Sequence, residues 1–310
     1  MTSPTASQPT IATIVERLWP GREIRISPIT AGLTNQNFRV EIDGTPFFVR
    51  LPGASTDLLA VDRANELQNT RAAAEAGVGP KLVAHDPQTG AFALEWVDGR
   101  TMSNAAFAEP GTPARIAEAL RRLHAGPRFR DDFDMSRLTQ RYLGVVEARS
   151  IRIPDGYREH AAQVARIEAA LAVHPLPTVP CHNDLLAENY LDDGTRLWIV
   201  DYEYSGNNDP TFELGNTAQE LQFHRARQEE VCAAYFGPER FAREGPALMA
   251  RMRLQMIMSD VGWTLWAAIQ ASISTIDFDF WGWAEERWAR ATTALDGPAF
   301  DERLAEVSRV

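Results

Sequence analysis

Hydrophobic and polar residues alternate in short runs over the first hundred residues, a pattern that predicts β-strands. A helical pattern interrupts the alternation over residues 57–76 and stops at Gly77–Pro80. Asp43-Gly44 lies between the second and third runs and predicts a hairpin turn. We therefore expect a small, mostly antiparallel sheet with one inserted helix. The predicted strands are Glu23–Ile29, Asn37–Ile42, Phe47–Leu51, Leu82–His85 and Phe92–Val97.

The pattern changes after residue 97, and the rest of the chain is mainly helical. Thr112-Pro113 predicts a helix start, with the threonine as N-cap. One strand-rich segment, Asn189–Asp201, contains the turn Asp192–Gly194. The sequence thus predicts an α+β protein with a sheet-rich lobe, residues 1–97, and a helical lobe, residues 98–310, preceded by a flexible start over residues 1–10. Ligands commonly bind in the cleft between two such lobes.

Composition and charge narrow the classes of function. The chain has 310 residues, of which 45% are hydrophobic and 24% charged, as in ordinary globular proteins. Its net charge of −11 argues against a nucleic-acid binder, which needs clustered Lys and Arg, and suits a cationic small molecule better. Two cysteines, Cys181 and Cys232, are too few for a disulfide framework or a zinc site. With no signal-peptide pattern and no long apolar run, we expect a cytoplasmic protein without membrane insertion.

The most informative motif is H-x-D-x-x-x-x-N, formed by His182, Asp184 and Asn189 and followed by a predicted hairpin that ends at Asp201. This is the spacing of the kinase catalytic loop, in which the aspartate receives the proton of the attacking hydroxyl and the asparagine holds Mg²⁺. Asp201 would supply the second metal ligand. Taken singly, each piece is also typical of a turn or of a helix N-cap with a buried histidine. The combination favours a kinase, with His182 forming structural hydrogen bonds.

These residues resemble the choline/ethanolamine kinase family, within the wider group of aminoglycoside-phosphotransferase-like kinases. The similarity continues through Tyr202–Asp209. The resemblance implies a protein-kinase-like two-lobed fold, with a small antiparallel N-lobe and a larger, mainly helical C-lobe. It also implies that Asp184 is the catalytic residue, that Asn189 and Asp201 are the Mg²⁺ ligands, and that Glu203 supports the metal site.

The first lobe is expected to bind ATP. The loop 31–37, which includes Asn35, resembles the family's phosphate-covering turn, although Gly, Thr and Asn are also what any hairpin needs. A kinase requires a cation over the nucleotide phosphates, usually paired with a helix glutamate. Arg50 and Glu66 are the candidates, and the family tends to carry arginine where other kinases carry lysine. The alternative is an exposed edge-strand arginine and a solvated glutamate.

The segment Leu94–Val97 at the lobe boundary resembles the kinase hinge, whose backbone amide and carbonyl bind adenine. Glu95 and Val97 are therefore candidates for nucleotide contacts. Backbone contacts leave little signature in side-chain identity, so this prediction rests on position along the chain.

Five of the eight tryptophans lie between residues 263 and 288. Trp263 and Trp266 share a helix face, where two indoles would form walls of a box for a quaternary ammonium group, each ring contributing roughly 0.5–2 kcal/mol. Residues 263–278 resemble the family's choline-binding segment. Trp283 falls where the family has tyrosine, and Glu220 matches a carboxylate near the ammonium group. The alternative is core packing, which we expect for Trp19, Trp96, Trp198, Trp281 and Trp288.

The leading hypothesis is ATP- and Mg²⁺-dependent phosphorylation of choline, or of a close methylated ethanolamine, to give phosphocholine and ADP. The first alternative is a kinase for another cationic alcohol, such as ethanolamine, an aminoglycoside or thiamine. The second is a non-catalytic choline-binding protein, which the presence of Asp184, Asn189 and Asp201 disfavours. A protein kinase is disfavoured because the chain after Asp201 leads within about ten residues into Pro210 and a helix, without a long activation segment.

Overall fold

The computed structural model describes residues 9–309 apart from 31, 33 and 54–56, and it divides into two compact units. The first unit comprises Met1–Thr56 and Pro80–Asp98, and the second comprises Asp57–Gly79 and Gly99–Val310. Residues 57–79, which the sequence pattern assigned to the first lobe, are thus grouped with the second unit. Of the predicted flexible start, residues 1–8 lie outside the described part, and Thr10 caps a helix instead.

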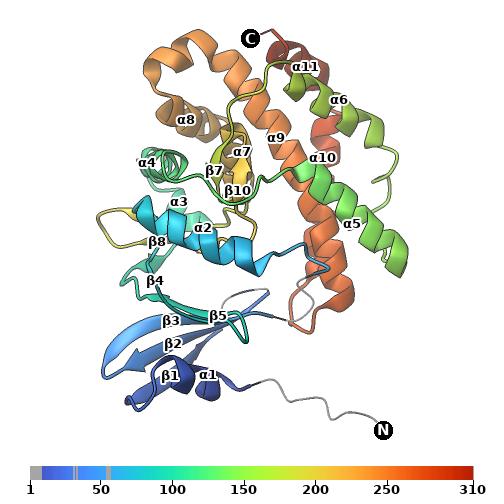
Figure 1. Ribbon diagram of the computed structural model, residues 1–310. Coiled ribbons are helices and arrows are strands. Elements are labelled where there is room, and N and C mark those ends of the chain that lie inside the picture. Colours follow the sequence, from blue (N-terminus) through green and yellow to red (C-terminus); the bar gives the residue numbers. More distant parts are fainter. Residues whose placement is uncertain (1–8, 31, 33, 54–56, 310) are drawn as a thin grey trace. The chain divides into compact units, whose positions relative to one another are not determined.

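The first unit is a five-stranded antiparallel sheet in the order β1-β2-β3-β5-β4, accompanied by helix α1 (Figure 1). Each predicted strand is present to within a few residues. The hairpin between β2 and β3 turns at Asp43 and Gly44, whose φ angles of 49° and 82° are typical of a type I′ turn. Val15 of α1 packs on the sheet with Val40, Val49 and Ala93. The elements are α1 (Ile11–Leu18), β1 (Ile24–Ile29), β2 (Gln36–Ile42), β3 (Thr45–Leu51), β4 (Leu82–Asp86) and β5 (Ala91–Glu95).

Two helix starts in the second unit differ from the prediction. Helix α2 (Arg63–Glu75) begins later than residue 57, because Asp62 is the N-cap and its carboxylate accepts hydrogen bonds from two backbone N–H groups. Helix α4 (Thr112–His124) has Gly111 rather than Thr112 as its N-cap. The Thr112 hydroxyl donates to the Phe107 carbonyl instead, at 2.8 Å.

The short strands of the second unit form two small sheets, and the predicted strand-rich segment supplies β8 and β9. Strands β6, β8 and β9 make one, and β7 pairs with β10 in the other. The predicted hairpin at Asp192–Gly194 joins β8 to β9, so this prediction is confirmed. The bounds are β6 (Arg100–Thr101), β7 (Val179–Cys181), β8 (Tyr190–Asp192), β9 (Leu197–Ile199) and β10 (Gly206–Asn208).

Helix α9 (Pro238–Ile273) is the longest described element and makes its main contacts with five other helices of its unit (Figure 1). Residue 215 of α7 is a glycine because an added Cβ would lie 2.8 Å from the Met252 carbonyl oxygen of α9. Among the described helices, α9 included, none is both long enough and apolar enough to cross a bilayer. The helices around α9 are α5 (Met135–Arg149), α7 (Pro210–Glu220), α8 (Arg225–Phe236), α10 (Phe280–Leu295) and α11 (Phe300–Val307), and α3 (Asn104–Phe107) and α6 (Ala161–Val173) complete the set.

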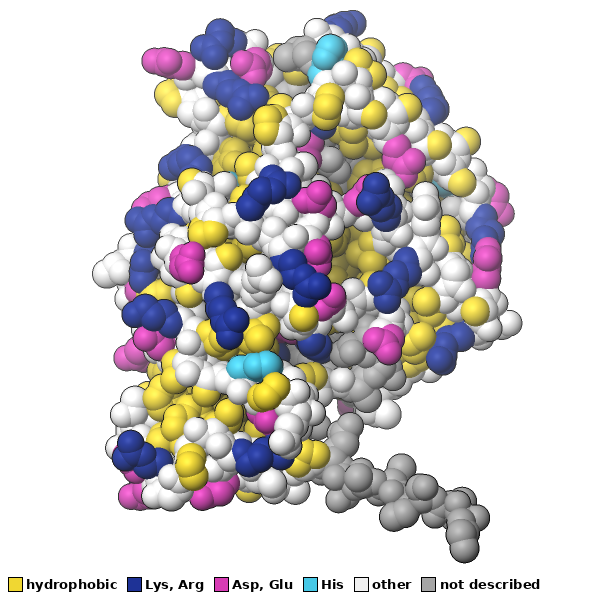
Figure 2. Space-filling model, viewed as in Figure 1, with side chains coloured by type: hydrophobic (Ala, Val, Ile, Leu, Met, Phe, Trp, Pro, Cys, Tyr) yellow, Lys and Arg dark blue, Asp and Glu magenta, His cyan; other side chains and the backbone are white. Residues whose placement is uncertain are grey.

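Charged side chains of both signs are mixed over the face of the molecule in Figure 2. Many form exposed pairs one helical turn apart, such as Arg122 with Glu118 and Arg225 with Glu229. Such pairs contribute little to stability individually.

Candidate active site

The segment His182–Leu185 follows β7 and is held by side chains rather than by secondary structure. Both carboxylate oxygens of Glu213 on α7 accept backbone N–H groups of this segment, each at 2.7 Å. Asn216, one turn further along α7, accepts another through Oδ1 at 2.7 Å, and the His182 ring accepts a fourth at 3.3 Å. The four donors are consecutive, so the loop that carries Asp184 is fixed at every residue. They are the amides of His182, Asn183, Asp184 and Leu185.

The His182 ring links this loop to the end of β9. Its Nδ1 accepts the Asp184 amide, and its Nε2 donates to the Val200 carbonyl at 2.8 Å. The ring is fully buried, and burial lowers the pKa of His182, which keeps the imidazole neutral. His182 therefore has the contacts of a structural residue, and it places Asp184 next to the segment that leads into Asp201.

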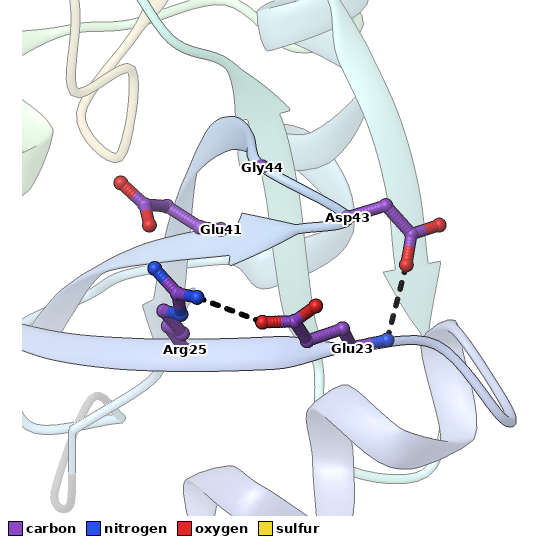
Figure 3. Close-up of a pocket in the computed structure, with 5 residues that line it drawn as sticks. All are labelled: Glu23, Arg25, Glu41, Asp43 and Gly44. Atoms are coloured by element: carbon purple, nitrogen blue, oxygen red, sulfur yellow. Dashed lines mark hydrogen bonds and ion pairs between the residues drawn. The ribbon is translucent and has the colours of Figure 1, made fainter.

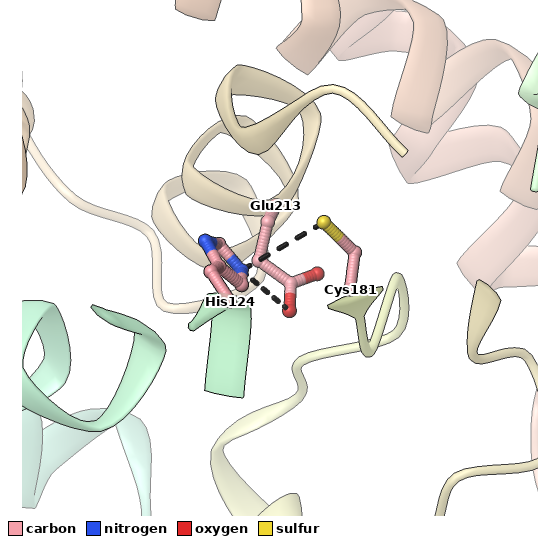
Figure 4. A group of neighbouring side chains, drawn as sticks. All are labelled: His124, Cys181 and Glu213. Atoms are coloured by element: carbon pink, nitrogen blue, oxygen red, sulfur yellow. Dashed lines mark hydrogen bonds and ion pairs between the residues drawn. The ribbon is translucent and has the colours of Figure 1, made fainter. Parts of the chain in front are cut away.

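A buried group of His124, Cys181 and Glu213 lies behind the loop (Figure 4). The His124 Nε2 atom is 3.7 Å from both the Cys181 sulfur and a Glu213 oxygen. Both Glu213 oxygens already accept loop amides, and burial raises the pKa of the Cys181 thiol, so the thiol stays protonated. These contacts make the group a support for the loop, and Cys181 and Cys232 are both free and buried.

Asp184 is half-buried and lies within the electrostatic influence of several charged residues. Burial is the largest cause of its raised pKa, followed by the negative charges of Glu220, Asp201 and Glu203, while Arg287 opposes the shift. The Asn189 side-chain amide nitrogen donates to the Asp184 carbonyl at 2.7 Å. This bond leaves the Asn189 amide oxygen as the atom available to ligate a metal.

Three carboxylates gather beside the end of β9. Oxygens of Glu66, Asp201 and Glu203 all lie within 4.8 Å of one another. Arg63 neutralises part of this charge, through contacts of 2.7 Å to Glu66 and 3.1 Å to Glu203. Mg²⁺ is bound in proteins by one or two carboxylates together with water and phosphate oxygens, so the donor set fits this ion.

The candidate nucleotide residues Arg50 and Glu66 are both buried, with exposed fractions of 4% and 1%. Arg50 lies on β3, which is flanked by β2 and β5, so the alternative of an exposed edge-strand arginine is wrong. The alternative that Glu66 is a solvated glutamate is also wrong, because its side chain is buried. Arg50 belongs to the first unit and Glu66 to the second, and their pairing stays a prediction.

The other candidate nucleotide residues lie in the first unit. Glu95 is the last residue of β5, and its backbone N–H donates to the Lys81 carbonyl at 2.9 Å, so this amide is already used within the unit. Val97 lies beyond the end of the strand. Asn35 accepts the Gly53 amide at 3.3 Å through its side chain. Their contacts with a nucleotide stay predictions.

The predicted tryptophans form one aromatic group with residues that the sequence pattern did not single out. Trp263 and Trp266 meet edge to face, with ring centroids 6.4 Å apart, and Trp283 lies 5.6 Å from Trp266. Tyr204 completes the group, since its ring is 4.9 Å from Trp263 and its hydroxyl accepts the Trp266 indole N–H at 2.7 Å. Phe280 lies against Trp266 at 5.9 Å. The structure therefore brings all three predicted tryptophans together.

Glu220, the last residue of α7, forms a buried ion pair with Arg287 of α10. The Arg287 guanidinium also lies 3.5 Å above the centre of the Trp283 ring. Glu220 and Trp283, both predicted to face a substrate cation, are thus in contact with a cation of the protein itself.

Sequence reasoning missed Tyr204, Glu213, Asn216 and Arg287. Glu213, Asn216 and Glu220 recur at helical spacing on α7, and this polar stripe within a predicted buried helix was the available signal. No comparable signal marks Tyr204 or Arg287, because their partners are distant in the sequence.

One hollow of the first unit lies over β1 and β2, away from these residues in the sequence (Figure 3). Arg25 pairs with Glu23 there at 2.9 Å, and Asp43 accepts the Glu23 amide at 3.0 Å. The carboxylates of Asp43 and Glu41 pair with Arg22 and Arg39, and the lining shares no residue with the predicted site. The lining residues are Glu23, Arg25, Glu41, Asp43 and Gly44.

The sequence model of choline/ethanolamine kinases matches residues 26–292. The chain belongs to the choline/ethanolamine kinase family. A crystal structure of a choline/ethanolamine kinase family protein from Mesorhizobium loti is similar, with a TM-score of 0.79 and 37% sequence identity over 92% of this chain and 93% of that chain. Human ethanolamine kinase 1 is 28% identical over 310 residues, covering 87% of this chain and 67% of that protein. Protein LicA of Haemophilus influenzae is 26% identical over 243 residues, covering 77% of this chain and 71% of that protein.

The wider kinase-like fold is confirmed by more distant structures. The aminoglycoside phosphotransferase APH(4)-Ia matches 94% of this chain with a TM-score of 0.64 at 14% identity, a likeness of fold alone. The predicted α+β fold class and the family are therefore both correct. As a member of this family, the protein is a phosphotransferase with a small alcohol as acceptor, and the family implies ATP as the phosphoryl donor.

Proposed function

We propose that the protein phosphorylates choline, or a close methylated ethanolamine, with ATP and Mg²⁺, and releases phosphocholine and ADP. The observation that carries this proposal is the aromatic group of Tyr204, Trp263, Trp266 and Trp283, which lies on the same unit as Asp184. Ring faces attract an alkylated ammonium group without offering it a hydrogen bond, which is what a quaternary ammonium requires. An aminoglycoside, with many ammonium groups, would instead need a rim of several free carboxylates.

Asp184 is the proposed catalytic residue. In the reaction, the alcohol oxygen forms a bond to the γ-phosphorus of ATP, the bond from that phosphorus to the bridging oxygen of ADP breaks, and the alcohol proton passes to the Asp184 carboxylate. A carboxylate whose pKa is raised by burial and neighbouring charge accepts a proton more readily than an exposed one. The fully bonded loop holds this carboxylate in position before the alcohol arrives.

The proposed metal ligands are Asn189 and Asp201, with Glu203 supporting the site. Mg²⁺ supplies neutralisation of phosphate charge when it is bound. The clustering of Asp201 with Glu203 and the free oxygen of the Asn189 amide support this assignment.

The proposed nucleotide contacts come from both units. Arg50, anchored by Glu66, would stabilise phosphate charge, Asn35 would lie at the phosphate-covering turn, and the backbone of Glu95 and Val97 would bind adenine. The burial of Arg50 and Glu66 supports a role inside a site rather than on the surface. A LicA structure with 22% sequence identity was solved in complex with AMP, which is consistent with an adenine nucleotide.

The proposal is tested by measuring ADP release from Mg-ATP with choline, ethanolamine, thiamine and kanamycin as acceptors. We expect choline to be preferred, Asp184→Ala to be inactive, and Trp263→Ala to raise the KM for choline about tenfold, equivalent to about 1.4 kcal/mol. Trp281→Ala is the matched control, since Trp281 lies on α10 and stacks with Arg152, outside the aromatic group. Preference for another acceptor, or equal effects of the two tryptophan variants, contradicts the choline assignment.

A further inference from the structure

Arg287 is a buried arginine whose hydrogen bonds are incomplete. Its side chain is 1% exposed, and among the described residues its polar partner is Glu220. Within the described part of the chain, its Nε and Nη1 atoms are buried without a hydrogen-bond partner. Its remaining contact is the face of the Trp283 ring.

Arg251, another buried arginine of the same unit, shows what a structural arginine looks like here. It binds Asp209 through Nε at 2.7 Å and donates to the carbonyls of His174 and Leu171 at 3.1 and 3.2 Å. All of its nitrogens therefore have an acceptor. The incomplete bonding of Arg287, combined with its position in the aromatic group, distinguishes it from a residue that only stabilises the fold.

Arg287 neutralises the carboxylate that was expected to attract the substrate cation. Glu220 is 8% exposed, and its partner is a guanidinium that cannot lose its proton. The neighbouring Arg290 does not replace Arg287, because it is bound to Asp260 at 2.6 Å. The substrate therefore meets a neutral ion pair at this wall rather than a free carboxylate.

We propose that Arg287 is a specificity-determining residue, which selects an alkylated ammonium over a primary ammonium by holding Glu220 and covering the face of Trp283. This inference rests on the proposed function. A primary ammonium has three N–H donors that lose water on binding and need acceptors, whereas a quaternary ammonium has none. With Glu220 occupied, the remaining walls are the rings of Tyr204, Trp263 and Trp266, which offer no carboxylate to N–H donors and so favour the alkylated cation.

The test compares kcat/KM for choline and ethanolamine in the wild type, Arg287→Met and Arg287→Lys. Arg287→Met frees the Glu220 carboxylate, so we expect the choline-to-ethanolamine ratio to fall roughly ten- to a hundredfold, the worth of a charged hydrogen bond, through a lower KM for ethanolamine. Arg287→Lys keeps a positive charge beside the Glu220 carboxylate and should keep the choline-to-ethanolamine ratio near that of the wild type. The double variant Glu220→Gln/Arg287→Met should restore the preference for choline.

Arg152→Met is the matched control, because Arg152, which lies between α5 and α6, stacks at 3.6 Å on Trp281 of α10, the helix that carries Arg287, and Trp281 is not part of the aromatic group; its ratio should not change. If Arg287→Met does not fold, Arg287→Gln removes the same charge and carries the same expectation. Either of two results overturns the inference. One is an equal loss of kcat/KM for both alcohols in Arg287→Met. The other is a change of the choline-to-ethanolamine ratio in Arg287→Lys as large as that in Arg287→Met. A wild type that phosphorylates neither alcohol, or that prefers ethanolamine, refutes the choline proposal first, so the two failures are distinguishable.

Discussion

Asn183, next to the proposed catalytic residue Asp184, and Asp201, a proposed metal ligand, have left-handed backbone conformations, with φ angles of 69° and 72°. Residues other than glycine rarely adopt this region, although Asn and Asp tolerate it best. At Asn183 the cost is offset by its side-chain amide, which donates to the Cys181 and Tyr204 carbonyls at 3.2 and 3.1 Å. Strain held in this way is typical of functional sites, where surrounding contacts determine the backbone.

Glu203→Gln tests the carboxylate group at the level of one residue. Removing one charge from the group should raise the Mg²⁺ concentration for half-maximal activity roughly 10–100-fold, the usual effect of a residue that supports a metal site. The measurement is a Mg²⁺ titration of ADP release at fixed ATP. Glu118→Gln, an exposed glutamate of α4, is the control and should leave the titration unchanged. An unaltered requirement in Glu203→Gln would remove Glu203 from the metal site.

Single residues also mark the limit of what the sequence predicts. Asp184, Asn189 and Asp201 follow a motif of fixed spacing, so they were found without a structure. Arg287 and Glu220 are 67 positions apart, and their pairing depends on how α7 and α10 pack against α9. Short-range sequence patterns contain no information about such packing, so Glu220 was proposed for the cation site without its partner Arg287.

At the scale of elements, the strands of the first unit were predicted correctly, whereas the starts of two helices were not. The five strands of the first unit were predicted because alternation and the Asp-Gly turn are local. Helix α2 has Asp62 as its N-cap and helix α4 has Gly111, because several neighbouring residues are of types that can cap a helix and the local pattern does not choose between them. Helix α1 was missed altogether, because eight residues give a short periodic signal.

Gly215 provides a test of how closely α7 approaches α9. An alanine there would place Cβ 2.8 Å from the Met252 carbonyl and 3.1 Å from the Met256 amide, both backbone atoms that cannot rotate away. We expect Gly215→Ala to push α7 from α9, to lower stability by about 1–3 kcal/mol and to reduce kcat, because α7 holds the catalytic loop. Thermal unfolding and steady-state kinetics measure both effects. Gly144→Ala on α5 is the control, since nothing lies within 4 Å of its added Cβ, and equal behaviour of the two variants would contradict the close approach.

The hairpin between β8 and β9 carries a pH-dependent contribution to stability. The Asp193 carboxylate accepts hydrogen bonds from the Thr195 hydroxyl, the Trp198 indole and the Arg196 amide, which lower its pKa well below the ordinary value. A lowered pKa in the folded state stabilises the fold above the unfolded pKa, near 4, and this stabilisation is lost as the pH falls through the folded value.

Asp193→Ala should therefore lower the free energy of unfolding by about 1 kcal/mol at pH 7, and the difference from the wild type should shrink below about pH 4. Urea denaturation at several pH values measures it. Asp301→Ala on α11, whose carboxylate is largely exposed, is the control, with a small effect at every pH. A difference that grows on acidification would have the wrong sign.

At the scale of the whole molecule, the proposed contacts of the two substrates divide between the units. The residues proposed for the alcohol, Glu220 and the aromatic group, all belong to the second unit, whereas the residues proposed for ATP, apart from Glu66, belong to the first: Asn35, Arg50, Glu95 and Val97. Choline alone should therefore slow amide hydrogen exchange in α7, α9 and α10 and leave β1–β5 unchanged, while ATP should slow exchange in β3 and β5. Exchange measured by mass spectrometry with each ligand tests this, and protection of β1–β5 by choline alone would contradict the division.

Helix α7 binds three of the four consecutive amides of loop 182–185, and this has a consequence for engineering. Residues 182–189 and helix α7 form a single transplantable part, since Glu213 and Asn216 shape the loop and Glu220, at the end of the same helix, contributes to the cation site. A chimera that exchanges only the loop with a relative separates the loop from the acceptors that fit it. A chimera that exchanges loop and helix together carries the catalytic geometry and one wall of the substrate site into the new host as one module.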